Sequence, residues 1–220
     1  MTSRFAILAS GRGSNLQALL DAIDTGLLDA RIVGVFSDKP AAAALARVPK
    51  PMRWARDAKT YAERARFDAE LADAVTACQP DWVICAGYLR ILGEAFVACF
   101  RGRLLNIHPS LLPKYRGLRT HARALEAGDF EHGASVHFVI PELDAGAVIA
   151  QAPVPVLTSD TVESLTQRVL RVEHPLLVHV AKLAADGRLS ERDGAAIVDG
   201  QPLFTPHRIE FAPEWPPLVR

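Results

Sequence analysis

Short apolar runs dominate the first half of the chain. Most are apolar without alternation, which is typical of strands that are covered on both faces of a sheet. Four such runs are FAILA at residues 5–9, RIVGVF at 31–36, WVICA at 82–86 and RLLNI at 103–107. A shorter strand is expected around Trp54, in the segment MRWA.

Between these runs the apolar residues recur at helical spacing. Leu16, Leu19 and Ile23 follow the first strand and predict a helix that ends near Gly26. Further helical patterns cover residues 41–48, 60–79 and 92–100. Strands that alternate with helices predict an α/β protein with an open, mostly parallel twisted sheet and helices on both faces.

The order of elements changes after residue 108. The expected segments are a polar loop to residue 118, a helix at 120–128, a strand at 134–140, a strand at 147–156 and a long helix from Asp160. Pro153 and Pro155 place the second of these strands at a sheet edge. Glu163, three residues after Asp160, is expected to be the capping-box partner at the start of the long helix, and Pro175 is expected to kink it. A Pro-rich tail should lie over the surface or fray.

Composition narrows the classes of partner. The 220 residues carry 25 basic and 25 acidic side chains, so the net charge is zero and nothing favours nucleic acid. The three cysteines show no CxxC spacing and are typical of packed thiols in a reducing compartment. Neither a signal-peptide core nor a membrane-span length of apolar residues is found, so we expect a cytoplasmic protein without a membrane partner.

The segment SGRGSN joins the first strand to the first helix. A helix N-terminus offers free N–H groups and a positive dipole end, which suit an anion. The dinucleotide fingerprint lacks its third glycine here, because Leu16 stands at that position. We therefore interpret Gly13, Ser14 and Asn15 as a cradle for a single phosphate. A tight turn in which Ser14 or Asn15 caps the helix is an equally good interpretation of this stretch alone.

Polar residues also end the strand at 103–107. Asn106 and His108 are two positions apart and share a face in an extended chain, at the edge of the sheet where ligands of open α/β proteins bind. Asp144, in the turn PELDAG, could raise the pKa of a nearby histidine. Taken singly, each of these sites is better explained by polar residues that face water or form an ordinary turn.

Other sites are disfavoured by spacing. The remaining histidines do not form a metal-ligand pattern, and no HExxH occurs, so no metal is expected. No GxSxG motif supports a serine hydrolase. Only Asp38, after the second strand, favours a non-catalytic nucleotide- or NAD-binding module.

Five long motifs, in order between residues 5 and 203, resemble the phosphoribosylglycinamide formyltransferase family. They are ASGRGSNLQALL at the start, ICAGYLRIL at 84–92, LLNIHPSLLPKYRG at 104–117, HGASVHFVIPELDAG at 132–146 and RVLRVEHPLL at 168–177. The resemblance implies the formyltransferase fold, with a Rossmann-like N-terminal half. It also implies transfer of a formyl group from 10-formyltetrahydrofolate to the amine of glycinamide ribonucleotide.

The resemblance assigns roles to residues by position. Asn106, His108 and Asp144 correspond to the catalytic residues, and Gly13, Ser14, Asn15 and Glu173 to the ribonucleotide site. The folate contacts implied are Arg64, Leu89, Arg90, Ile91, Leu92, Ile140, Pro141, Glu142 and Leu143. Leu170 replaces a polar residue of some relatives, and Arg116 and Arg119 also differ. We expect a nucleotide-phosphate half at 1–102, a catalytic and folate-binding half at 103–203 on the same sheet, and a tail at 204–220.

The residue types fit this chemistry. An amine that attacks a formyl carbon leaves a tetrahedral oxyanion, to which the Asn106 amide and a charged His108 could donate. Asp144 would favour the charged imidazole, which could then protonate the departing folate nitrogen. No metal is needed. The expected partners are small molecules, and the protein is expected to be a monomer or homodimer.

Two related activities remain as alternatives. Methionyl-tRNA formyltransferase shares the SLLPxxRG pattern, but it lacks the SGRGSN turn and carries a further C-terminal domain. Formyltetrahydrofolate hydrolase has a different residue where Pro109 stands and an added N-terminal domain. Only about 35 residues follow the long helix here, and neither extra domain is expected.

Overall fold

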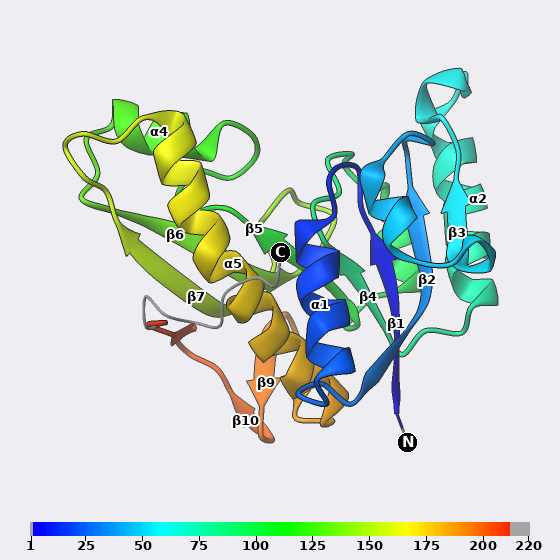
Figure 1. The fold of residues 1–220 in the computed structure, drawn as a ribbon. Coiled ribbons are helices and arrows are strands. Elements are labelled where there is room, and N and C mark those ends of the chain that lie inside the picture. The colour runs from blue at the N-terminus through cyan, green and yellow to red at the C-terminus, as the bar shows by residue number, and fades with distance from the viewer. Residues whose placement is uncertain (1, 212–220) are drawn as a thin grey trace.

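A twisted sheet of eight strands forms the centre of the molecule in a computed structural model, which describes residues 2–211 (Figure 1). Its strand order is β11-β7-β6-β5-β4-β1-β2-β3. The strands are β1 (Ser3–Leu8), β2 (Ala30–Ser37), β3 (Arg53–Ala55), β4 (Trp82–Cys85), β5 (Leu104–His108), β6 (Glu131–Phe138), β7 (Val148–Pro155) and β11 (His207–Arg208). From β3 to β5 neighbouring strands are parallel, whereas β6 is antiparallel to both β5 and β7. The predicted open, mostly parallel α/β sheet is confirmed.

Five α-helices surround this sheet within the described residues. They are α1 (Ser14–Asp24), α2 (Arg64–Ala77), α3 (Glu94–Cys99), α4 (Thr120–Glu126) and α5 (Val162–Ala185). Short 3₁₀ turns cover Ala43–Arg47, Lys50–Met52 and Ala58–Thr60. A separate small sheet contains β8 (Leu189–Arg192), β9 (Ala195–Val198) and β10 (Gln201–Pro202). None of the helices in residues 2–211 combines the length and apolar character needed to cross a membrane.

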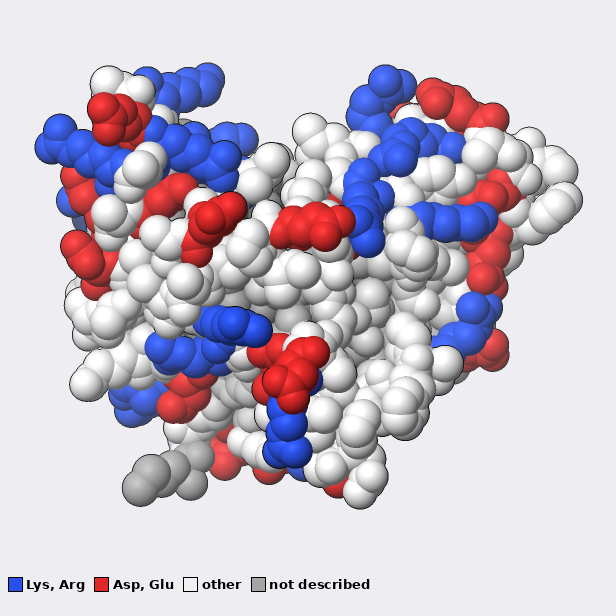
Figure 2. Space-filling model, turned by 180° about the vertical axis from the view of Figure 1, so that it is seen from behind, with Lys and Arg blue, Asp and Glu red and all other residues white. Residues whose placement is uncertain are grey.

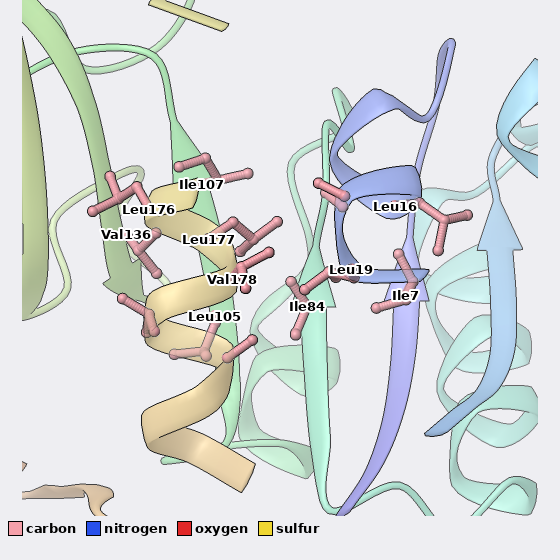
Figure 3. Close-up of a cluster of buried hydrophobic side chains, with 14 of the residues drawn as sticks. Ile7, Leu16, Leu19, Ile84, Leu105, Ile107, Val136, Leu176, Leu177 and Val178 are labelled. Carbon is pink, nitrogen blue, oxygen red and sulfur yellow. The ribbon is translucent and has the colours of Figure 1, made fainter. Parts of the chain in front are cut away.

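Two apolar clusters cover the two faces of the sheet. Alternation along β1 places Phe5 and Ile7 in one cluster and Ala6 and Leu8 in the other, and all four are fully buried. Figure 3 shows the first cluster, in which α1 and α5 pack on the sheet. Its labelled side chains are Ile7, Leu16, Leu19, Ile84, Leu105, Ile107, Val136, Leu176, Leu177 and Val178. α2 and α3 supply the second cluster, so the continuous apolar runs reflect cover on both faces.

Several element boundaries differ from those expected. α2 begins at Arg64 rather than near residue 60, because a separate 3₁₀ turn, capped by Asp57, occupies residues 58–60. β6 spans residues 131–138, and Ile140 lies in the loop after it, next to a proline that has no N–H to donate. The hairpin of β8 and β9 was not predicted. Residues 207–208 of the tail pair with β7, and residues 212–220 lie outside the described part.

The sheet runs without a break through both expected halves of the chain. The boundary expected between residues 102 and 103 falls in the short connection between α3, which covers one face of the sheet, and β5, which is part of it. The division into two halves remains a prediction. The kink at Pro175 also remains a prediction, since α5 runs through that proline without ending.

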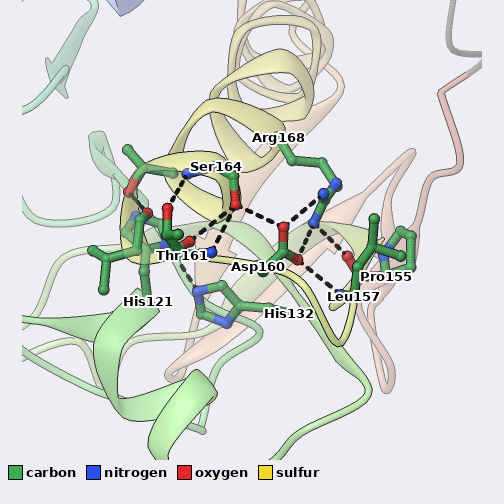
Figure 4. Close-up of polar contacts among 10 residues, drawn as sticks. His121, His132, Pro155, Leu157, Asp160, Thr161, Ser164 and Arg168 are labelled. Atoms are coloured by element: carbon green, nitrogen blue, oxygen red, sulfur yellow. Dashed lines mark hydrogen bonds and ion pairs between the residues drawn. The ribbon is translucent and has the colours of Figure 1, made fainter.

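The start of α5 is fixed by a polar network (Figure 4). The capping box is formed by Thr161 and Ser164, so the expected start near Asp160 with Glu163 as its partner was wrong by one residue. Asp160 instead makes two bonds to Arg168, with Oδ1 2.8 Å from Nη2 and Oδ2 2.5 Å from Nη1. Asp160 also accepts from Leu157 N and Ser164 Oγ. The network therefore ties the loop after β7 to the first two turns of α5.

Replacing Asp160 by Ala should destabilise the protein, because the guanidinium of Arg168 and a backbone N–H lose their acceptor. The free energy of unfolding should fall by about 2–4 kcal/mol, between the effect of a lost helix cap and that of a lost partner in a buried pair. Urea unfolding measures this change. Lys182→Ala breaks an exposed pair with Asp186 in the same helix and should change stability by no more than about 0.5 kcal/mol. Equal effects of the two substitutions would contradict the assignment.

The contribution of Asp160 should also depend on pH. Its hydrogen bonds to Arg168 hold the pKa of this carboxyl below its ordinary value of 3.8. A lowered carboxyl pKa stabilises the fold fully above the ordinary value and less as the pH falls towards the folded value. The stability difference between wild type and Asp160→Ala should therefore shrink below about pH 4.

Candidate active site

A cavity of about 430 Å³ opens at the carboxyl ends of the central strands. This volume is usual for a small-molecule site. The chain runs outward from β1 to β2 and β3, and in the other direction from β4 to β5, so the cavity lies beside the topological switch point where ligands of open sheets bind. The lining is drawn from α1, the segment after β4, β5, the loops after β5 and β6, and α5.

Asn106, His108 and Asp144 all line this cavity. Asn106 and His108 lie on the same face of β5 as alternate residues. Asp144 reaches them from the turn after β6, with its Oδ2 3.4 Å from His108 Nδ1. Two neighbouring side chains of β5 and one from a turn 36 residues further on thus meet at one end of the cavity.

His137 is a fourth member of this group that sequence analysis missed. The antiparallel register of β5 and β6 places it opposite Asn106, and its Nε2 lies 3.1 Å from Asn106 Nδ2 and 3.6 Å from Asp144 Oδ1. Its Nδ1 lies 2.7 Å from the carbonyl oxygen of Phe138, so Nδ1 carries a proton. In the neutral ring Nε2 then accepts from Asn106, which orients the amide.

Burial changes the protonation of the pair His108 and Asp144. Burial lowers the pKa of His108, and the negative charge of Asp144 and the carbonyl of Tyr115 oppose this effect. The expected direction of the Asp144 contribution is therefore correct, but the net pKa of His108 lies below its ordinary value. Burial alone would raise the pKa of Asp144, yet His137, His108 and the Gly117 N–H outweigh it, and the net pKa is lowered. Asp144 is thus ionised at neutral pH.

The loop after β5 contacts both members of this pair. The His108 Nε2 donates to the carbonyl oxygen of Tyr115 at 3.0 Å, since a carbonyl can only accept. Gly117 N donates to Asp144 Oδ2 at 2.8 Å. In this conformation the second ring nitrogen of His108 therefore holds a protein partner instead of facing an empty cavity.

The segment expected to hold a phosphate lies at the start of α1, and Asn15 is the one of its three residues that lines the cavity. Gly13 adopts φ 75°, and a Cβ there would lie 2.7 Å from Ala44, so only glycine fits without strain. No side chain caps the helix, so the alternative in which Ser14 or Asn15 is a plain cap does not hold. The first backbone N–H groups of α1 are free for an anion.

Asn15 and Glu173 connect this cradle with the cavity. Both are buried and line it, and Asn15 Nδ2 donates to Glu173 Oε2 at 3.1 Å. Burial raises the pKa of Glu173, and the bond from Asn15 opposes this effect. The other amide atom, Asn15 Oδ1, is buried without a hydrogen-bond partner in the described residues. A polar pair with spare bonding capacity therefore faces the cavity.

The expected folate contacts lie mostly on the apolar side of the cavity. The residues that line it are Leu89, Arg90, Ile91, Leu92, Ile140, Pro141 and Leu143. Leu89 and Ile91 are 62% and 50% exposed, a high value for such side chains. Arg64 and Glu142 do not line the cavity: Arg64 donates to the Ile91 carbonyl, and Glu142 pairs with Arg116. Their roles remain predictions.

The contacts of Asp38 and the burial of Cys85 explain what these two side chains do. Asp38 accepts from Ser10 Oγ at 2.5 Å, and Ser10 Oγ accepts from Leu89 N, so Asp38 supports the segment after β4. Burial raises the pKa of Cys85 to about 12, which keeps this cavity thiol protonated.

Within residues 2–211 no three His, Cys, Asp or Glu side chains are grouped so that they could hold a metal ion.

Charge on the surface does not single out a partner. Figure 2 shows acidic and basic residues of both signs scattered around a largely uncharged centre. This pattern agrees with the net charge of zero. Recognition of an anion must therefore depend on local groups such as the start of α1.

Comparison with known proteins finds relatives of this chain in both sequence and structure. Residues 3–181 match the formyl transferase family. The phosphoribosylglycinamide formyltransferase of Escherichia coli is 48% identical over 199 residues, which are 90% of this chain and 94% of that protein. A solved phosphoribosylglycinamide formyltransferase from Coxiella burnetii has a TM-score of 0.88 and 39% identity, and the match covers 94% of this chain and 99% of that one. A formyltetrahydrofolate deformylase from Pseudomonas syringae has a TM-score of 0.79 and 28% identity, and the match covers 90% of this chain and 66% of that one.

Replacing Asp144 by Asn should lower the pKa of His108 further, because it removes the negative charge that favours the imidazolium. NMR titration of the His108 ring measures this pKa directly. Glu142→Gln is the matched control, since this neighbouring carboxylate pairs with Arg116 and not with His108. An unchanged titration in Asp144→Asn would contradict the pairing.

Proposed function

The chain belongs to the phosphoribosylglycinamide formyltransferase family, and from that premise we propose that it transfers the formyl group of 10-formyltetrahydrofolate to the amine of N1-(5-phosphoribosyl)glycinamide. The observation that carries the proposal is one cavity that joins an uncapped helix start to the group Asn106, His108 and Asp144. The reaction belongs to purine biosynthesis and uses soluble metabolites, for which a cytoplasmic location is expected.

Each substrate has a region of the cavity that matches its chemistry. The ribonucleotide phosphate binds the backbone N–H groups at Gly13, Ser14 and Asn15, because a helix start favours an anion. Glu173 lies next to Asn15 and accepts a hydrogen bond from the glycinamide amine. The folate ring system contacts the apolar residues of the segments 89–92 and 140–143. This arrangement brings the amine and the formyl carbon together near His108.

Attack of the amine on the formyl carbon converts the carbonyl oxygen into an oxyanion. The Asn106 amide donates one N–H to His137 and has the other available for this oxygen. A single donor of this kind is typically worth about 3–4 kcal/mol in the barrier. Because His137 holds the amide in place, little reorganisation is needed as the charge develops.

His108 supplies the second interaction and the proton. Its pKa is lowered in the substrate-free site, but a developing negative charge beside the ring favours the imidazolium. The reacting group takes the hydrogen bond that the Tyr115 carbonyl holds in the absence of substrate. His108 then protonates the departing folate nitrogen as a general acid. Asp144 stabilises the imidazolium and, through a water, accepts the proton lost by the attacking amine.

Purified protein should release tetrahydrofolate from 10-formyltetrahydrofolate only when the ribonucleotide is present. His108→Ala should lower kcat by at least about a hundredfold, the usual effect of a lost general acid. It should leave the ribonucleotide affinity, measured by calorimetry, nearly unchanged. Formyl release that does not need the ribonucleotide would instead indicate a hydrolase, the activity named for the Pseudomonas relative.

A bulky residue at Gly13 should weaken the binding of the ribonucleotide and not that of the folate. Gly13→Val forces a side chain into the φ 75° conformation and against Ala44, so we expect the KM for the ribonucleotide to rise at least tenfold with little change for the folate. Gly26→Val is the matched control, because Gly26 has φ 74° at the other end of the same helix and open space around it. Equal changes in both KM values would place the phosphate elsewhere.

A further inference from the structure

Arg47 is an exposed arginine beside the start of α1 that no part of the proposed mechanism uses. It is the last residue of the 3₁₀ turn Ala43–Arg47, which lies between β2 and β3. A Cβ at Gly13 would lie 3.1 Å from Arg47 Nε. The guanidinium therefore lies directly against the loop 11–13, which leads into α1.

The two hydrogen bonds of this guanidinium connect the loop with the helix. Arg47 Nε donates to the carbonyl oxygen of Arg12 at 3.0 Å, and Arg47 Nη1 donates to Gln17 Oε1 at 2.6 Å. Arg12 precedes the helix, and Gln17 lies in its first turn. Both acceptors are neutral oxygens, so neither compensates the positive charge of the guanidinium.

All three carbonyl groups of the loop 11–13 accept a hydrogen bond from the protein. In chain order the donors are Ala44 N at 3.0 Å, Arg47 Nε and Gln17 N at 2.9 Å. Two of these donors belong to the same 3₁₀ turn. Because each carbonyl oxygen faces a protein donor, it is not directed at an anion that approaches the free N–H groups of α1.

Asn15 gives independent evidence that a polar ligand binds at this place. Its side chain is 7% exposed and lines the cavity, and within residues 2–211 its Oδ1 has no hydrogen-bond partner. A buried polar atom without a partner is costly, so a ligand with a donor group, such as a sugar hydroxyl, stabilises it. A sugar hydroxyl next to an anion site is the chemistry of a sugar phosphate.

We propose that Arg47 is a positioning residue that holds the loop 11–13 in the conformation that binds the phosphate of the ribonucleotide. It acts through the Arg12 carbonyl and the Gln17 side chain, and the backbone N–H groups of α1 make the contacts to the phosphate. Lysine at this position would keep the charge but not the planar fork that reaches two acceptors. The inference rests on the proposed function, because it concerns the same ribonucleotide.

The test measures binding of two ligands without turnover. Calorimetry gives the Kd of the ribonucleotide and that of glycinamide ribonucleoside, which lacks the phosphate. Arg47→Gln should raise the Kd of the ribonucleotide about tenfold, and Arg47→Lys about threefold. The Kd of the ribonucleoside should change by less than about twofold in both variants, because this ligand has no phosphate for the loop to bind.

The kinetic constants should show the same selectivity. In Arg47→Gln the KM for the ribonucleotide should rise about tenfold, while kcat and the KM for the folate stay within about twofold of the wild type. The midpoint of thermal unfolding should stay within about 2 °C, since an exposed side chain contributes little to stability. Gln17→Leu removes the second acceptor and should give a smaller effect in the same direction.

Arg53→Gln is the matched control. Arg53 Nε also donates to a backbone carbonyl, that of Val48 at 2.7 Å, but this bond does not involve the loop 11–13. The control should leave both Kd values unchanged. Ribose 5-phosphate is a further probe, because the amide NMR signals of Ser14 and Asn15 report its binding in the absence of any formyl transfer. Its Kd should also rise in Arg47→Gln.

The outcomes separate the two proposals. An equal rise in Kd for the ribonucleotide and the ribonucleoside would mean that Arg47 only supports the local fold, and would overturn the inference. Wild-type affinity in Arg47→Lys would also overturn it, since charge alone would then be sufficient. Absence of formyl transfer by the wild type, together with binding of ribose 5-phosphate that depends on Arg47, would overturn the proposed function and support the role of Arg47.

Discussion

The antiparallel register between β5 and β6 is the constraint on which the site depends. It places Asn106 opposite His137, and His108 opposite Ser135. The chain leaves β6 at Phe138 and returns to β7 at Val148, so the turn that carries Asp144 folds back over the end of β5. A slip of one residue would turn Asn106 and His108 to the other face of the sheet. Apolar packing of β5 and β6 on both faces thus fixes the geometry of the polar group.

The site concentrates charged and polar groups in a chain that has no net charge. Burial lowers the pKa of His108 and raises that of Glu173, so it shifts both groups towards their neutral forms. Asp144 stays ionised because the Gly117 N–H and two histidines surround it. The electrostatic field in the site is therefore set by a few fixed groups such as the Gly117 N–H. A negative charge on a substrate beside His108 would raise the pKa of its ring.

The sequence predicts the strands well because a continuous apolar run indicates a strand that is covered on both faces of the sheet. The resemblance to the formyltransferase family, and not the local pattern, groups Asn106, His108 and Asp144, and the structure brings these side chains together at the cavity. His137 and Arg47 were missed. The partners of each come from a strand register or from the packing of a 3₁₀ turn, which the local pattern does not determine. The cap of α5 shows the same limit, since Thr161 and Asp160 are equally good caps by residue type.

The neighbouring positions of β1 and β4 also explain why the two substrate regions meet. The segment that follows β1 begins at Ser10 and leads to the start of α1, while the segment after β4 leads to Leu89 and Arg90. Ser10 bonds to Gly87 and Leu89, so a single residue at the root of the phosphate cradle also holds the folate segment. A displacement of either segment must stretch these bonds. The switch point of the sheet thus fixes the distance between the start of α1 and the segment 87–93, where the two substrates are proposed to bind.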